Sequence, residues 1–92
     1  MIDFEWDPDK AIANESKHGI SFVEAATAFG DPLSVSVFDP DHSNNEDRFL
    51  LLGESDFGTL IVISHTDRSG IIRIISARRA NRNERLQYES KH

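Results

Sequence analysis

Cysteine is absent from this sequence, which excludes a disulfide framework, a thiolate zinc site and a cysteine nucleophile. Long apolar runs are absent as well, so we expect neither a signal peptide nor a membrane-spanning helix. Both absences are typical of a cytoplasmic protein. The 92 residues are 38% hydrophobic and 28% charged, a composition that predicts one small globular domain over residues 1–92. Because so short a chain buries a thin core, it is suited to a homodimer or hetero-oligomer.

Basic residues are scarce in the first two thirds of the chain and concentrated at its end. Residues 1–66 contain 13 acidic and three basic residues, whereas residues 67–92 contain three acidic and seven basic ones. The two parts carry formal charges of −10 and +4, which together give the net charge of −6. This average argues at first sight against a nucleic-acid partner. The six arginines between residues 68 and 85 can nevertheless focus a local positive field.

Local signals predict three helices and five strands. Capping residues followed by apolar spacing predict helices that begin after Asp7, Ser21 and Asn81. The first helix is expected to end at His18-Gly19 and the second before Gly30-Asp31-Pro32. Alternating or apolar runs predict strands over residues 2–6, 33–38, 48–52, 59–66 and 71–78.

The predicted order is β-α-α-β-β-β-β-α, with two helices before a run of four strands. The connections over residues 53–58 and 67–70 are short enough for hairpins, so the simplest sheet is an antiparallel meander. Helices grouped before such strands predict an α+β fold, in which a small antiparallel sheet is flanked by helices.

The last predicted hairpin assigns residues to the two faces of the sheet. A turn over residues 67–70 would pair Ser64 with Arg73 and would give Arg73 and Arg79 the same orientation. The more apolar face, predicted to lie under the helices, carries Ile61, Ile63, His65, Ile72 and Ile74. An arginine in a largely buried strand requires water or a charged partner. Arg73 therefore belongs either to a functional site or to an ion pair with an acid of the first half.

Metal and cofactor motifs are absent. The four histidines, His18, His42, His65 and His92, do not have the spacing of a zinc motif. The polar loop over residues 39–47 lacks the glycine and the last glutamate of a calcium loop. No glycine-rich phosphate loop or hydrolase triad is present either. We therefore expect neither a metal nor a cofactor.

Cations, a histidine and a tyrosine are sufficient to cleave RNA by means of its own 2′-hydroxyl group. A base takes the hydroxyl proton, cations stabilise the charge on the phosphorane oxygens, and an acid protonates the leaving 5′-oxygen. Histidine can serve as base or acid near neutral pH, and tyrosine can stack on a nucleobase. Composition alone leaves this as one interpretation among several.

Two long motifs resemble the signatures of a known protein family. The first is Phe4-Glu5-Trp6-Asp7-Pro8-Asp9-Lys10-Ala11, followed by Asn14 and by Lys17-His18-Gly19-Ile20-Ser21-Phe22. The second is Ile72-Arg73-Ile74-Ile75-Ser76-Ala77-Arg78-Arg79-Ala80, followed by Glu84, Arg85 and Tyr88. Together they frame nearly the whole chain and resemble the two ends of the BrnT family of bacterial toxins.

The resemblance implies a RelE-like fold and the activity of a ribonuclease that inhibits translation, in the cytoplasm of a bacterium. It also implies a type II toxin–antitoxin module, in which the partner is a BrnA-like antitoxin with a ribbon-helix-helix domain. In such a module operator DNA is contacted by the antitoxin, which is compatible with the acidic average charge of this chain.

The matched polar residues, together with the neighbouring Arg82, supply the candidates for contact with RNA. The catalytic candidates are His18, Arg73, Arg79 and Tyr88. The candidates for contacts with the RNA backbone are Lys10, Lys17, Arg78 and Arg82. Other matched residues have structural roles: Asp7 caps the first helix, Glu84 closes a capping box, and Trp6 packs with Phe22.

One departure from the family pattern keeps a second function open. Asn81 and Asn83 stand where relatives are expected to carry a threonine and a basic residue, which weakens the basic surface of the last helix. The alternative to a ribonuclease is therefore an inactive binding module that only pairs with an antitoxin-like protein. A structural subunit with no nucleic-acid role is the third possibility.

Overall fold

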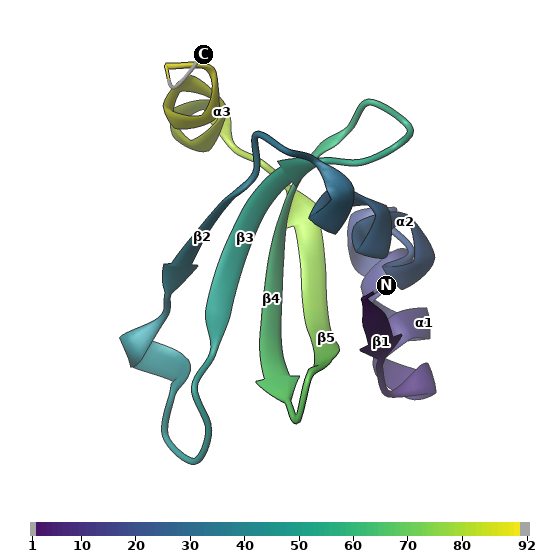
Figure 1. Cartoon of the computed structure of the whole chain (residues 1–92). Coiled ribbons are helices and arrows are strands. Elements are labelled where there is room, and N and C mark those ends of the chain that lie inside the picture. Colours follow the sequence, from purple (N-terminus) through teal and green to yellow (C-terminus); the bar gives the residue numbers. More distant parts are fainter. Residues whose placement is uncertain (1, 91–92) are drawn as a thin grey trace.

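The computed structural model describes residues 2–90 (Figure 1). Its elements follow the chain in the order β1 (Asp3–Glu5), α1 (Pro8–His18), α2 (Phe22–Thr27), η1 (Ala28–Gly30), β2 (Val35–Phe38), η2 (Pro40–His42), β3 (Phe49–Glu54), β4 (Leu60–Arg68), β5 (Ile71–Arg79) and α3 (Arg82–Glu89). The predicted α+β class and the order of helices and strands are confirmed. The second predicted helix is split into α2 and the 3₁₀ helix η1, and the polar loop contains the 3₁₀ helix η2.

The five strands form one sheet in the order β1-β5-β4-β3-β2. Strands β2 to β5 form the predicted antiparallel meander. β1 lies at the opposite edge from β2 and pairs in parallel with β5, so that Phe4 lies opposite Ile72. The prediction of a wholly antiparallel sheet is therefore wrong at this edge. The two helices carry the chain from β1 at one edge of the sheet to β2 at the opposite edge. The meander then runs back across the sheet, so that its final strand, β5, pairs with β1.

The helices cover different faces of the sheet. α1 and α2 pack on one face, whereas α3 lies on the other side (Figure 1). The core lies between the sheet and the first two helices, and its fully buried members include Ile20, Phe22, Ile61, Ile63 and Ile74. Trp6 meets Phe22 edge to face with ring centroids 5.9 Å apart, which confirms their predicted contact. The two faces therefore present different surroundings to the side chains of β5.

The β4–β5 hairpin has a tighter turn than the sequence predicts. Arg68 pairs with Ile71 across a two-residue turn, in which Ser69 and Gly70 have φ of 55° and 85°. Two positive φ values are typical of a type I′ turn, whose twist matches that of the adjoining strands. A register shift follows between Ser64 and His65. The predicted pairing of Ser64 with Arg73 is therefore wrong: Thr66 lies opposite Arg73.

Candidate functional site

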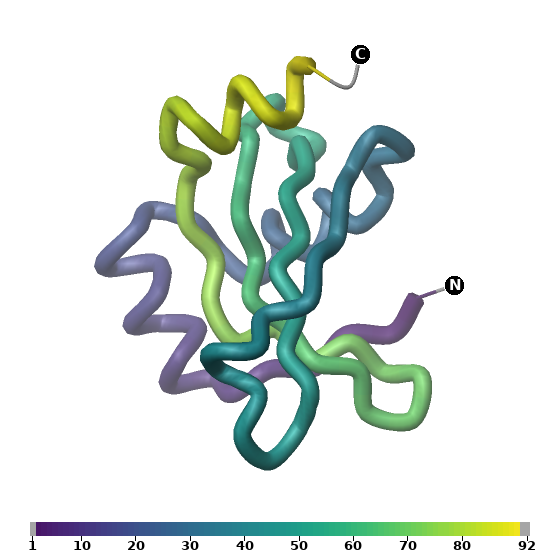
Figure 2. Tube along the Cα trace, turned by 90° about the vertical axis from the view of Figure 1, so that its left-hand side faces the viewer, coloured from purple at the N-terminus to yellow at the C-terminus, as the bar shows by residue number. Residues whose placement is uncertain are grey.

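The end of α1 lies beside the end of β5. Asn14 is buried, and its Nδ2 donates to the carbonyl of Ala77 at 2.9 Å, while its Oδ1 accepts from the Ala77 N–H at 3.1 Å. His18 is one helical turn beyond Asn14 and lies on the same side of the helix. The tube in Figure 2 shows α1 running beside the second half of β5. The contact therefore places the last turn of α1 next to the last residues of β5.

Basic residues stand at the end of α1, at the end of β5 and at the start of α3. Lys17 and His18 occupy the last turn of α1, Arg79 ends β5, and Arg82 begins α3. We call these four residues the cationic end. Lys17, Arg79 and Arg82 are exposed, and within residues 2–90 no hydrogen bond or ion pair engages their side chains. The cationic end is thus open to an anion of another molecule.

Arg79 faces the side of the sheet that α1 and α2 cover. Directly opposed residues of an antiparallel pair share a face. Arg79 lies opposite Ile61, which belongs to the core under α1 and α2. The side chain of Arg79 therefore projects from the face of the sheet on which these two helices pack, at the C-terminal end of β5.

Arg73 lies on the other face and already has an acidic partner. It lies opposite Thr66, and its Nη1 donates to the carboxylate of Glu5 on β1 at 2.7 Å. This confirms the interpretation of Arg73 as a partner of an acid in the first half. The predicted common orientation of Arg73 and Arg79 is wrong, because the bulge inserts one extra residue between them.

Arg78 fastens α3 to the sheet. Its two terminal nitrogens donate to the two carboxylate oxygens of Glu84, both at 2.8 Å. Oε1 of Glu84 also accepts from the N–H of Asn81, which completes the predicted capping box of α3. The hydrogen bond from Arg78 lowers the pKa of Glu84 below its ordinary value. In this arrangement the Arg78 guanidinium is neutralised by the protein's own carboxylate.

Tyr88 is the second attachment of α3. Its hydroxyl donates to Oδ2 of Asp31, which also accepts from the N–H of Glu54 at 2.8 Å. Burial, followed by the contact with Asp31, raises the pKa of Tyr88 to about 12. The Tyr88 hydroxyl is therefore neutral near pH 7 and is directed at a carboxylate.

A groove separates α3 from the sheet beneath it. Its volume is about 290 Å³, with an apolar floor made by the sheet and a polar rim made by α3. The lining residues are Val35, Val37, Leu50, Leu52, Val62, Glu84, Gln87, Tyr88 and Ser90. No local signal in the sequence predicts this groove, because its floor comes from three strands whose relative order only the folded sheet defines.

The predicted site residues thus fall into separate places. Lys17, His18, Arg79 and Arg82 stand at the ends of α1 and β5 and at the start of α3, while Arg78 and Tyr88 make the contacts that attach α3 to the rest of the fold. Arg73 lies near the edge strand β1. Lys10 occupies the first turn of α1, seven residues before Lys17 and so about 10 Å away along the helix axis.

His65 is a buried histidine without a polar contact in the described part of the chain. It lies between the rings of Phe29 and Phe49, whose centroids are 4.9 and 5.9 Å from its own, and both ring nitrogens lack a hydrogen-bond partner. Burial lowers the pKa of His65 below its ordinary value, although Asp67 opposes this shift. The prediction that His65 faces the helices is confirmed.

The described residues contain no group of three or more histidine, aspartate or glutamate side chains placed to hold a metal ion. Among residues 2–90, no helix has the length and apolarity needed to span a bilayer.

Comparisons with known proteins identify the family. A crystal structure of the Brucella abortus ribonuclease toxin BrnT superposes with a TM-score of 0.64 at 21% sequence identity, over 89% of this chain and all of the other. This similarity shows a common fold. No curated protein matches the sequence. The model of the family described as ribonuclease toxin, BrnT, of type II toxin–antitoxin systems matches residues 6–84. The chain therefore belongs to the BrnT ribonuclease toxin family.

Proposed function

We propose that this protein is an endoribonuclease toxin that cleaves RNA by general acid–base chemistry without a metal ion. The observation that carries the proposal is the match to the BrnT family over residues 6–84. The cationic end supports it, because three exposed basic side chains there have no acidic partner within the described residues. RNA phosphates are the natural counterions of such a surface.

His18 and Arg79 are the proposed reacting groups. In the reaction, a base takes the proton of the 2′-hydroxyl, the 2′-oxygen attacks the phosphorus, and the bond from phosphorus to the 5′-oxygen breaks. An acid then protonates the 5′-oxygen, which leaves a 2′,3′-cyclic phosphate and a 5′-hydroxyl. His18 transfers a proton in one of these steps, and Arg79 stabilises the charge on the phosphorane oxygens.

Lys10, Lys17 and Arg82 are the proposed contacts with the RNA backbone. Lys10 and Lys17 extend the cationic surface along α1, and Arg82 extends it to α3. Arg73, Arg78 and Tyr88, also proposed at the sequence level, each contact a carboxylate of the protein. Their participation in binding or catalysis requires that RNA replace that carboxylate.

The proposed partner is an antitoxin that neutralises the enzyme. By resemblance to the family, we expect a BrnA-like protein with a ribbon-helix-helix domain that makes the contacts with operator DNA. The complex is expected to be a hetero-oligomer in the bacterial cytoplasm. Its formation would keep the ribonuclease inactive until the antitoxin is removed.

The test is cleavage of RNA by the purified protein in the presence of a chelator. We expect products with 2′,3′-cyclic or 3′-phosphate ends and a loss of about 100-fold or more in Arg79→Ala, a typical effect of removing one group that stabilises developing charge. Arg48→Ala is the matched control. It also removes one arginine, but this residue lies just before β3, at the opposite end of the sheet, so the variant should retain activity. Cleavage that stops when the chelator is added would contradict the metal-independent mechanism.

An inactive binding module is the second candidate, and the two asparagines at Asn81 and Asn83 favour it. It predicts a stable complex with the product of the adjacent gene but no RNA cleavage. Growth after induced expression distinguishes the two candidates. Arrest by the wild-type protein, relieved by the adjacent gene and absent in a folded Arg79→Ala, supports the toxin, whereas normal growth with soluble protein supports the binding module.

A further inference from the structure

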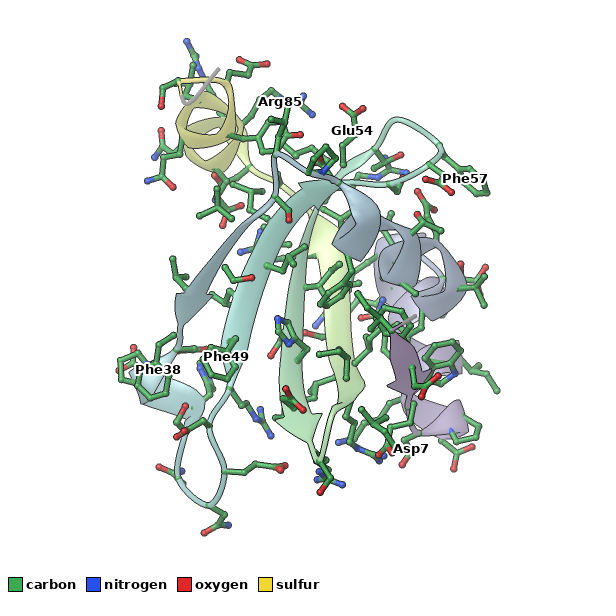
Figure 3. The ribbon with its side chains drawn as sticks, viewed as in Figure 1. Asp7, Phe38, Phe49, Glu54, Phe57 and Arg85 are labelled. Atoms are coloured by element: carbon green, nitrogen blue, oxygen red, sulfur yellow. The ribbon has the colours of Figure 1, made fainter. Side chains whose placement is uncertain are left out.

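The turn between β3 and β4 presents an aromatic side chain to solvent. Phe57 is 79% exposed, more than any other large hydrophobic side chain in the described part of the chain. Figure 3 shows it at the tip of the turn, directed away from the sheet. An aromatic ring left in water contributes little to the fold, and this one is available for contact with another molecule.

The turn that carries Phe57 is held rigidly. Ser55 is buried, and its Oγ accepts from the N–H groups of Phe57 at 3.2 Å and Thr59 at 3.3 Å. The same hydroxyl donates to Glu24 of α2 at 2.8 Å, and the N–H of Asp56 donates to Thr27 of α2 at 2.9 Å. These bonds tie both sides of the turn, so that the backbone of Phe57 has little freedom left to lose.

A rigid, protruding aromatic has the properties of an anchor in a protein–protein interface. Large aromatic residues contribute most of the binding free energy at many interfaces, and a group held in its bound position loses little entropy on association. Burial of Phe57 in a partner would remove from water the apolar area that the toxin leaves exposed.

The charge around Phe57 favours a protein over RNA as the partner. The segment from Glu54 to Thr59 carries two carboxylates, Glu54 and Asp56, and no basic residue. Glu24 adds a third carboxylate through its hydrogen bond with Ser55. Phosphates of RNA would be repelled here, whereas lysine or arginine side chains of a protein would be attracted.

The turn lies at the same end of the sheet as the cationic end. Glu54, which precedes the turn, is paired with Leu60, and the carbonyl of Leu60 accepts from the N–H of Ala80, next to Arg79. A protein bound at Phe57 would therefore lie beside the proposed reacting groups. Such a protein could prevent RNA from reaching Arg79 without contacting every residue of the site.

We propose that Phe57 is the anchor by which the antitoxin holds this toxin. The ring enters an apolar pocket of the antitoxin whose rim carries basic side chains that face Glu54 and Asp56. The inference rests on the proposed function, because it takes the antitoxin as the partner.

The test compares the affinity of toxin variants for the antitoxin encoded by the adjacent gene, measured by calorimetry. Phe57→Ala should raise the Kd by about tenfold or more, as expected for a buried aromatic anchor. Asp56→Asn should raise it less, and only at low salt. Ile12→Ala is the matched control, because Ile12 is 70% exposed on α1, away from the turn, and its loss should leave the Kd unchanged.

RNA cleavage supplies the second readout. Phe57→Ala should cleave RNA at the wild-type rate and should require more antitoxin for inhibition. An unchanged Kd in Phe57→Ala, an equal loss in Ile12→Ala, or a loss of RNA cleavage in Phe57→Ala would each overturn the inference. A wild-type protein that neither cleaves RNA nor binds the antitoxin would instead contradict the proposed function.

Discussion

Arg73 and Arg79 lie on the same strand but project from opposite faces of the sheet. The bulge near His65 shifts the register of β5, so that Arg73 lies opposite Thr66 and Arg79 lies opposite Ile61. Arg73 is bonded to Glu5, whereas the Arg79 side chain has no partner within residues 2–90. The two arginines are therefore expected to behave differently when they are replaced.

A double-mutant cycle tests the structural role of Arg73. Arg73→Gln and Glu5→Gln should each lower the free energy of unfolding, with a coupling of about 0.5–1 kcal/mol because the pair is partly exposed. Chemical denaturation of the four proteins measures this coupling. A coupling close to zero, together with a large loss of RNA cleavage in Arg73→Gln alone, would show that Arg73 serves the reaction and not the fold.

Asn14 is predicted to be essential for the packing of α1 on β5. Asn14→Ala leaves the N–H and carbonyl of Ala77 buried without their partners, and also frees the carbonyl of Ile20. The expected loss is about 2–4 kcal/mol in the free energy of unfolding, since an unsatisfied buried polar group is costly. Glu15→Ala, at an exposed neighbouring position, should change stability by less than about 0.5 kcal/mol. Equal stabilities of the two variants would contradict this role.

His65 makes stability depend on pH in the weakly acidic range. Its pKa in the folded protein lies below the ordinary value of 6.5, so the unfolded chain binds a proton that the folded chain does not. Stability should therefore fall as the pH decreases below about 6.5, until the folded-state pKa is reached. Urea denaturation between pH 7.5 and 5.5 (about one unit either side of 6.5) measures the slope.

His65→Leu is the control for this pH dependence. It keeps an apolar side chain between Phe29 and Phe49 and removes the titrating group. The other three histidines remain in both proteins, so the difference in slope reports His65 alone. A variant with the same slope as the wild-type protein would assign the pH dependence to another residue.

Tyr88 can be titrated directly, because it is the sole tyrosine of the sequence. The ultraviolet absorbance of its phenolate should appear with a midpoint near pH 12, above the ordinary value of 10.0. The neutral phenol is favoured in the folded state, so the stability it contributes is present below pH 10 and is lost as the pH rises towards 12. A midpoint close to 10 in the folded protein would contradict the contact between Tyr88 and Asp31.

Asp31→Asn separates the causes of the raised pKa. The variant removes the carboxylate next to the phenol but leaves Tyr88 partly shielded from water, so the midpoint should fall part of the way back towards 10. Circular dichroism at each pH checks that the protein remains folded during the titration.

Local signals in the sequence predicted the helices and strands of this protein well, but they predicted less well which strands pair with each other. Asp7 and Gly19 mark the ends of α1 as expected, because a capping side chain and a left-handed glycine act within one helical turn. The capping box of Asn81 and Glu84 is present for the same reason. The parallel pairing of β1 with β5 was missed, since residues almost 70 positions apart had to meet, as in the Phe4–Ile72 pair.

The candidate site likewise has features that the sequence predicted and features that it did not. The sequence predicted which side chains carry charge and, by its two motifs, the family to which they belong. It could not predict that a bulge places Arg73 and Arg79 on opposite faces, because one extra residue in a strand reverses the orientation of every residue beyond it.

The sequence by itself determined both ends of α1, the start of α3, the approximate strand segments, the absence of cysteine chemistry and the concentration of basic residues near the C-terminus, because these depend on residue identity and short-range spacing. Only the tertiary structure decided which of these basic side chains stay free. Arg73 and Arg78 are neutralised by Glu5 and Glu84, whereas Arg79 remains open to solvent. The physical reason is that an ion pair requires two charges within a few ångströms, and the folded sheet sets that distance.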